Sequence, residues 1–170
     1  QLLPVYNKPM IYYPLTTLIE NGIQNICLIS TPEDTPRFRK LLDDGSRFGV
    51  SMNYRVQPEP KGIAQAFLVA RDFIGTNNVS LILGDNIFSS SEKFQEAFAG
   101  FKRGAVIFGR EVEDLSKYGV VEFDKEWRVL SIQEKPKIPK GTHAVPGFYL
   151  YDDQIVSIAE SLQPSERGEL

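Results

Sequence analysis

The segment that decides the fold is Val79–Phe88, which reads VSLILGDNIF. Its first five residues are apolar apart from one serine, a pattern typical of a strand that is buried on both faces of a sheet. Gly84 and Asp85 follow at once, so the aspartate stands at the carboxyl end of the strand. Because ligands of open α/β sheets bind outside the carboxyl ends of the strands, we expect Asp85 to reach a ligand crevice.

Two roles are open to Asp85 on this segment alone. A carboxylate at a strand end suits Mg²⁺, which prefers oxygen ligands and often bridges one or two carboxylates to substrate phosphates. Aspartate equally often caps a turn or the next helix. The segment itself favours neither role, so other parts of the chain have to decide.

Short apolar runs alternate with amphipathic ones along the first 110 residues, which predicts strands alternating with helices. After about residue 110 two strand-like runs and a short turn predict an antiparallel hairpin. We therefore predict an α/β fold with a mixed, mostly parallel sheet and helices on both faces, in one domain over residues 1–170. The predicted helices are 9–22 (Pro9 in the first turn, Gly22 as the cap), a helix over Phe38–Leu42, 62–73, 92–101 and 152–162; the predicted strands are 25–30, 52–56, 79–83, 105–108, 119–124, 127–132 and 148–151.

Composition excludes some classes of partner. The formal net charge is -3 and no basic cluster is present, which argues against nucleic-acid binding. No apolar stretch approaches the roughly 18 residues that a membrane span requires. The single cysteine, Cys27, lies in an apolar run and predicts a small core residue of a protein from a reducing compartment. We expect a cytoplasmic protein.

A second candidate site is the segment Gln57–Ala66, QPEPKGIAQA. Two prolines stiffen the loop, and the small residues that follow predict a helix N-terminus whose free N–H groups can meet a base or an anion. The alternative is a plain loop that leads into an amphipathic helix, and spacing alone favours this alternative.

Several long segments together resemble the glucose-1-phosphate thymidylyltransferases. They occur in the same order and cover essentially the whole chain, which makes them more specific than any single motif. The segments are QLLPVYNKPMIYYPL at 1–15, ISTPEDTPRF at 29–38, the Gln57 loop, LILGDNIF at 81–88, YGVVEF at 118–123, EKP at 134–136 and RGEL at 167–170.

The resemblance implies a Rossmann-like, glycosyltransferase-A-type fold and the transfer of a thymidylyl group from dTTP to glucose 1-phosphate. The products would be pyrophosphate and dTDP-glucose, a precursor of deoxysugars such as rhamnose. Mg²⁺ would be the cofactor, and the family suggests a homotetramer. By motif, Asp85 would hold Mg²⁺ and the nucleotide, Gln57 and Gly62 the thymine edge, Gly119, Glu134 and Val145 the sugar, and Lys135 and Arg167 the sugar phosphate.

The family's glycine-rich loop, an arginine and a lysine would precede Gln1, and a second metal aspartate would follow Leu170, so we expect a domain that is incomplete at both ends. Two other functions stay open: a related transferase that uses UTP, and a non-catalytic nucleotide sensor. Glu134 and Lys135 could also be plain solvated charges. We predict that His143 is a loop residue and that Trp127 packs on the hairpin.

Overall fold

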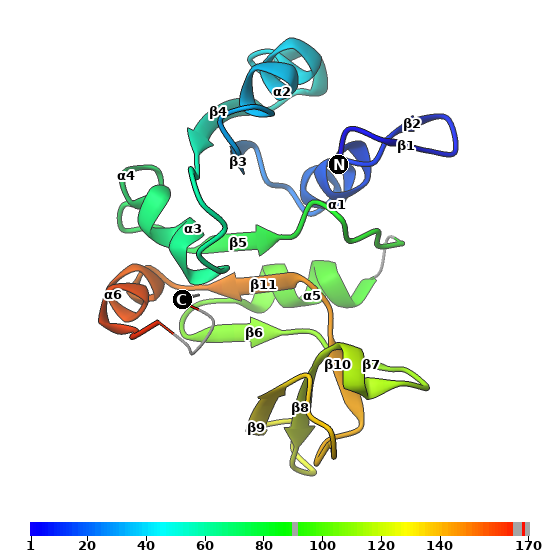
Figure 1. Cartoon of the computed structure of the whole chain (residues 1–170). Helices are drawn as coiled ribbons and strands as arrows, with labels where there is room; N and C mark the ends of the chain where they lie inside the picture. Colours follow the sequence, from blue (N-terminus) through cyan, green and yellow to red (C-terminus); the bar gives the residue numbers. More distant parts are fainter. Residues whose placement is uncertain (90–91, 165–167, 169–170) are drawn as a thin grey trace.

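The computed structural model describes residues 1–89, 92–164 and 168. Figure 1 shows three strands side by side in the middle of the molecule, a strand pair with two helices on one side of them, and a small sheet on the other side. No helix in the described part of the chain is long and apolar enough to cross a membrane.

The N-terminal part is built around a parallel pair of strands, β3 and β4, in which Asn25 lies opposite Ser51. Helix α1 ends at Glu20, and the chain turns away at Gly22, whose φ of 81° suits glycine. The N–H groups of Gly22 and Ile23 donate to carbonyls of the last helical turn and close it. The elements are β1 (Pro4–Val5), β2 (Lys8–Pro9), α1 (Tyr12–Glu20), β3 (Asn25–Ser30), α2 (Thr35–Leu42), a 3₁₀ turn (Ser46–Phe48) and β4 (Ser51–Val56).

The middle of the molecule is a three-stranded sheet in the order β5–β11–β6. Strand β11 runs antiparallel to both neighbours, with Phe148 opposite Ile82 and Tyr149 opposite Ile107. The elements of this part are α3 (Ala64–Val69), α4 (Arg71–Ile74), β5 (Val79–Ile82), α5 (Glu92–Gly100), β6 (Ala105–Ile107), β11 (Phe148–Tyr151) and α6 (Gln154–Ser161).

Helices cover both faces of this sheet, and strand β11 shows why. Successive side chains of a strand point to opposite faces, and Phe148 and Tyr151 lie three positions apart. The Phe148 ring meets Phe94 of α5 at a centroid distance of 5.2 Å, whereas the Tyr151 ring meets Phe67 of α3 at 5.4 Å. Each face therefore has its own core, one with α1, α2 and α5 and one with α3, α4 and α6.

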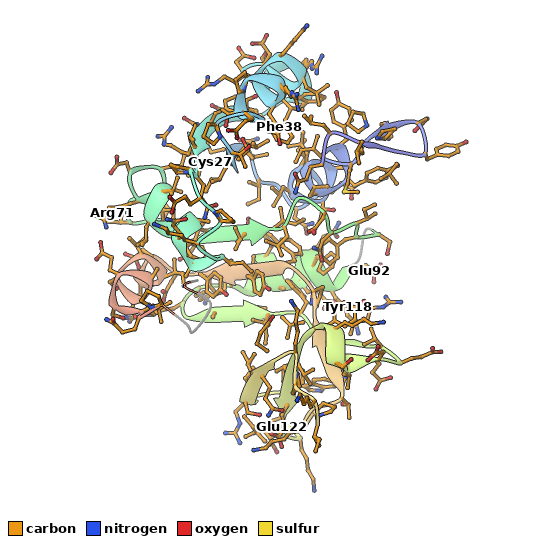
Figure 2. All side chains as sticks on the ribbon, viewed as in Figure 1. Cys27, Phe38, Arg71, Glu92, Tyr118 and Glu122 are labelled. Carbon is orange, nitrogen blue, oxygen red and sulfur yellow. The ribbon has the colours of Figure 1, made fainter. Side chains whose placement is uncertain are left out.

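A separate four-stranded antiparallel sheet has the order β7–β10–β8–β9. Figure 2 labels Tyr118 and Glu122 in this part of the molecule and Phe38 in helix α2. The sheet contains β7 (Arg110–Glu111), β8 (Gly119–Phe123), β9 (Val129–Glu134) and β10 (His143–Val145), with a 3₁₀ turn at Leu115–Lys117 before β8.

The α/β fold with helices on both faces is confirmed, but the sheet is less parallel than predicted. Only β3 and β4 pair in parallel among the described strands. The cause is β11, which returns after the hairpin and inserts between β5 and β6. Sequence periodicity contains no information on which strand a late segment joins.

Several predicted boundaries were wrong for local reasons. Pro9 pairs with Pro4 in a two-residue strand, so the first helix begins only at Tyr12. The helix predicted over 62–73 is split at Ala70 (φ -98°, ψ 10°) and cannot include Gly62, whose φ is 93°. These dihedral angles lie outside the right-handed helical region.

The hairpin is confirmed, with a longer turn than predicted. Trp127 has a φ of 60° and lies in the turn, so β9 starts at Val129. The Asp124 carboxylate organises this turn by accepting bonds from the N–H groups of Glu126 and Arg128. Trp127 packs on the hairpin as predicted, with its ring 5.4 Å from that of Phe123.

The prediction that His143 is a loop residue was wrong. His143 is the first residue of β10 and lies opposite both Glu111 and Val121. Its ring stands edge-on to Phe123 and to Trp127, at centroid distances of 5.7 and 5.8 Å. The histidine therefore belongs to an aromatic cluster on the small sheet.

Candidate active site

An open cavity of about 510 Å³ lies between strands β3 and β5 and contains the first group of predicted site residues. Gln57 and Gly62 line it on the side of helix α3, and Gly84 lines it at the end of β5. A Cβ on Gly84 would lie 2.8 Å from Cγ of Gln1, so the start of the chain and the end of β5 approach each other closely here. The structure thus brings the Gln57 loop and the end of β5 to one cavity.

The Gln57 side chain is held by hydrogen bonds within the protein. Its Nε2 donates to Oε1 of Gln65 at 2.6 Å and makes a longer bond of 3.4 Å to the Gly62 carbonyl. Gly62 has a φ of 93°, a left-handed conformation that favours glycine. The half-buried Gln57 amide is therefore oriented before any ligand binds.

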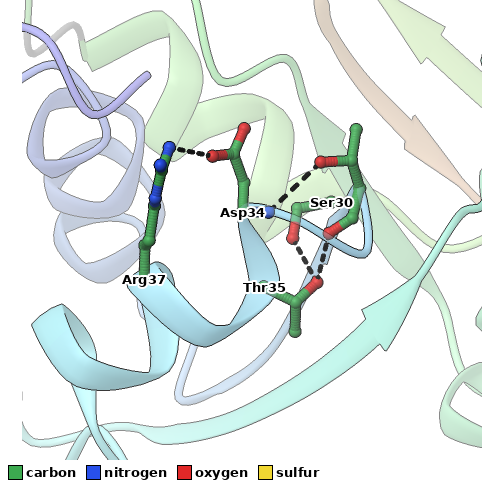
Figure 3. A network of polar contacts seen from close by, with 5 residues as sticks. Ser30, Asp34, Thr35 and Arg37 are labelled. Atoms are coloured by element: carbon green, nitrogen blue, oxygen red, sulfur yellow. Dashed lines mark hydrogen bonds and ion pairs between the residues drawn. The ribbon is translucent and has the colours of Figure 1, made fainter.

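The loop after β3 forms another part of the cavity wall (Figure 3). Oγ of Ser30 and Oγ1 of Thr35 lie 2.6 Å apart, and Thr35 also donates to the Thr31 carbonyl at 2.8 Å. Asp34 pairs with Arg37 at 3.0 Å. These bonds fix the start of α2 and keep Ser30, Thr31 and Asp34 at the cavity.

The turn after β5 is anchored by Asn86. Its Oδ1 accepts a bond from the backbone N–H of Gly147 at 3.0 Å, and its Nδ2 donates to Oδ1 of Asp85 at 2.9 Å. The Leu83 N–H adds a bond of 2.8 Å to the Gly147 carbonyl. Asp85 lies exposed at the carboxyl end of β5, as predicted, but it is next to the cavity and not among the residues that line it. Its neighbour Asn86 holds one of its oxygens.

The residues at the carboxyl end of β5 determine whether Mg²⁺ could bind there. Among the described residues no group of three or more His, Cys, Asp or Glu side chains could hold a metal ion. Mg²⁺ keeps several waters and binds through one or two carboxylates plus substrate phosphates. A single exposed Asp85 carboxylate therefore fits Mg²⁺ when a phosphate ligand is present and offers little to the free ion.

The three predicted sugar residues meet on the small sheet, each from a different strand. Gly119 of β8 lies opposite Glu134 of β9 and Val145 of β10. A Cβ on Gly119 would lie 3.5 Å from Oε2 of Glu134 and 3.9 Å from the Val145 side chain. This missing side chain leaves the Glu134 carboxylate open to the face above Gly119.

Lys135 follows Glu134 at a sharp bend of the chain. Its φ is 41°, and its N–H donates to the Tyr118 carbonyl at 3.0 Å, which fixes the bend. Its Nζ lies 3.5 Å from Oε1 of Glu134, with both side chains at least half exposed. Lys135 is therefore grouped with the sugar residues, while Arg167 lies outside the described residues.

Sequence reasoning missed two residues that tie these groups together. Asn86 connects Asp85 to Gly147, which lies two positions from Val145, and its place beside Asp85 was the available signal. Tyr149 was the other: burial, and then the negative charge of Glu134, raise the pKa of its phenol. The nucleotide-side and sugar-side groups thus share one support, the segment from Val145 to Tyr149.

Comparison with known proteins places the chain in a family. The sequence pattern of the family described as "Nucleotidyl transferase" matches residues 1–170. The glucose-1-phosphate thymidylyltransferase of Neisseria gonorrhoeae is 52% identical over 173 residues, covering 100% of this chain. That of Mycolicibacterium smegmatis is 51% identical over 175 residues, covering 99%. The chain spans 60% and 59% of the length of these two relatives.

Solved structures agree with this result. A Bacillus anthracis protein described as a glucose-1-phosphate thymidylyltransferase, solved in complex with a sucrose, superposes with a TM-score of 0.90 at 41% identity, covering 99% of this chain and 69% of that one. A UDP-glucose pyrophosphorylase complexed with UDP-glucose gives 0.82 at 23% identity, covering 99% and 73%, and so shares the fold. The chain therefore belongs to the nucleotidyl transferase family.

Proposed function

We propose that the complete protein transfers a thymidylyl group from dTTP to glucose 1-phosphate and releases pyrophosphate, forming dTDP-glucose. The observation that carries this proposal is the identity of about half of all residues to glucose-1-phosphate thymidylyltransferases, over the whole of this chain. The geometry supports it, because the residues expected at the base line one cavity, and Asp85 and the residues expected at the sugar are held by one segment around Gly147.

At the base end, Gln57 and Gly62 would hold the thymine edge. The Gln57 carbonyl oxygen would accept a bond from the ring N–H, and the Gly62 backbone N–H would donate to a neighbouring carbonyl of the base. Both groups line the cavity between β3 and β5. The donors of the Gln57 amide are already bonded within the protein, so its oxygen is the group left for the base.

At the triphosphate, Asp85 would hold Mg²⁺, which would neutralise negative charge on the phosphate oxygens. Asn86 donates to one oxygen of Asp85 and so leaves the other oxygen available. The bond from Gly147 to Asn86 keeps this turn in place relative to the sugar group. Asp85 would thus act from a fixed position at the end of β5.

At the sugar end, Glu134 would accept hydrogen bonds from sugar hydroxyls above Gly119, and the backbone at Gly119 and Val145 would add further contacts. Lys135 would exchange its ion pair with Glu134 for the phosphate of glucose 1-phosphate, since a phosphate carries the greater charge. Arg167, outside the described residues, is proposed as a second cation, which can bind a phosphate bidentately.

The chemical step would be an in-line displacement. An oxygen of the sugar phosphate attacks the α-phosphorus of dTTP, a new P–O bond forms, and the bond to the β-phosphate oxygen breaks with release of pyrophosphate. The work of the protein is positioning and charge neutralisation. Asp85 and the sugar residues are held by one segment of the chain, an arrangement that suits this task.

The test is the release of pyrophosphate by the complete protein from glucose 1-phosphate with either dTTP or UTP. We expect dTTP to be used with the higher kcat/KM; a preference for UTP would assign the related class, and no turnover with either would favour a nucleotide sensor. Glu134→Gln should raise the KM for glucose 1-phosphate by about 10-fold or more, because a bond to a charged group is lost. Glu126→Gln, on the exposed turn of the same hairpin, is the matched control.

We also propose that the complete protein is a homotetramer in the cytoplasm that serves deoxysugar synthesis. This part rests on the resemblance to the thymidylyltransferases. The mass of the purified complete protein in solution, measured by light scattering, tests the oligomeric state, and a monomer would contradict it.

A further inference from the structure

Gln65, which is hydrogen-bonded to the Gln57 amide, bears on which nucleobase the site accepts. Gln57 Nε2 lies 2.6 Å from Oε1 of Gln65 and 3.4 Å from the backbone carbonyl of Gly62. The two ends of an amide differ, since the nitrogen only donates and the oxygen only accepts. The orientation of the Gln57 amide therefore determines which of these two chemistries faces the cavity.

The Gly62 carbonyl determines the direction of this pair. A backbone carbonyl can only accept, so the group of Gln57 that faces it must be the nitrogen. Gln65 must then present its oxygen to the other hydrogen of the same nitrogen. A flipped Gln57 would lose its short bond to Oε1 of Gln65 and would place its oxygen 3.4 Å from the Gly62 carbonyl, a weaker contact.

Both amide hydrogens of Gln57 are directed into the protein by these bonds, and its Oε1 has no donor among the described residues. Gln57 lines the cavity, whereas Gln65, in helix α3, is not among the described residues that line it. Gln65 is half-buried, like Gln57. Gln65 therefore acts on a ligand only through Gln57.

We propose that Gln65 is a positioning residue that keeps the Gln57 carbonyl oxygen directed at the nucleotide, so that the site selects a pyrimidine with a ring N–H. This inference rests on the proposed function, because it deepens the base recognition of that same site. Thymine and uracil carry a hydrogen at N3 and can donate to Oε1. Cytosine has a lone pair at N3, which would face the Gln57 oxygen without a hydrogen between them.

Loss of the Gln65 acceptor should reduce this selection. Only the long bond to Gly62 would then hold the amide, so the flipped state, which offers a donor to cytosine, would become populated. One neutral hydrogen bond corresponds to a factor of about 2–10 in an equilibrium. We expect the ratio of dTTP affinity to dCTP affinity to fall by this factor.

The experiment measures the binding of dTTP and of dCTP to the complete protein by calorimetry, without glucose 1-phosphate. Gln65→Met removes the acceptor at similar length, and Gln65→Glu keeps an acceptor oxygen. We expect Gln65→Met to lower the ratio of the two affinities and Gln65→Glu to keep it. Gln95→Met, on the exposed surface of α5, is the matched control and should change nothing.

The possible failures are distinguishable. Equal affinities for dTTP and dCTP in the wild-type protein, or an unchanged ratio in a folded Gln65→Met variant, would overturn the role of Gln65. Tight and selective dTTP binding without pyrophosphate release would instead overturn the proposed reaction and leave the role of Gln65 standing. Should Gln65→Met not fold, an altered ratio in the Gln65→Glu variant would contradict the proposal.

Discussion

Replacing Asn86 with alanine should destabilise the turn that carries Asp85, and the structure gives the magnitude. Gly147 is buried, and its N–H donates to Oδ1 of Asn86 at 3.0 Å. A buried donor left without an acceptor costs about 1–3 kcal/mol. The second bond, to Asp85, adds little because that carboxylate is exposed. A loss of about 2 kcal/mol lowers the Tm of a protein of roughly 150–250 residues by about 4–8 °C, and that of a longer protein by less.

The assay is thermal unfolding of the complete protein, followed by circular dichroism. Asn86→Asp keeps an acceptor for Gly147 and should unfold within about 2 °C of the wild type. Asn78→Ala is the matched control, because Asn78 is exposed and makes one long bond of 3.3 Å to the Lys102 carbonyl. An Asn86→Ala variant as stable as Asn78→Ala would refute the anchoring role that we assign to Asn86.

Three further predictions follow from the same structure. Asp85→Asn in the complete protein should abolish most turnover while leaving the Tm nearly unchanged, and near-normal activity at low Mg²⁺ would contradict a role in metal binding. Burial, and then the neighbouring Tyr149, raise the pKa of Tyr151 to about 12 from an ordinary value of 10. Because the unfolded chain loses this proton at lower pH, the free energy of unfolding, measured in urea, should fall as the pH rises from 10 to 12. The fall should be less steep in Tyr151→Phe, and parallel pH curves for the two proteins would remove this residue as the cause. Residues 1–170 alone should release no pyrophosphate, and their β3 and β5 amides should exchange hydrogen faster than in the complete protein; equal exchange rates would show that nothing in the longer protein covers these edges.

The sequence could predict the parts of the site that depend on one strand end or one loop. Asp85 lies at the end of β5 because the apolar run before it has to stop there. The helix after the Gln57 loop was predicted as well, although it begins only at Ala64 because Gly62 is left-handed. The Gln57 loop was located on the same local grounds. These placements need no information about which strands are neighbours.

The hydrogen bonds and ring contacts that hold such residues in place could not be predicted, because their partners come from distant parts of the chain. Asn86 is held by Gly147, which lies 61 residues away, and His143 joins Trp127 and Phe123 only because β10 pairs with β8. The meeting of Gly119, Glu134 and Val145 likewise depends on the register of three strands. Motif resemblance grouped these last residues correctly, but strand periodicity alone could not.

The cavity between β3 and β5 lies between two strands whose sequences are typical of the interior of a sheet. Both strands, NICLIS and VSLI, are mainly apolar and contain no charged residue, a pattern typical of strands inside a sheet. Yet each is an edge strand among the described elements, and open edges are usually protected by charges, prolines or bulges. Gln1 lies at this cavity, against Gly84. A strand supplied by a longer chain would pair with both edges and fill the space between β3 and β5, so that only the end of the cavity at Gln57, Gly62 and Gly84, beyond the carboxyl ends of the strands, would stay open to a ligand. Slower hydrogen exchange at β3 and β5 is the direct measure of that pairing.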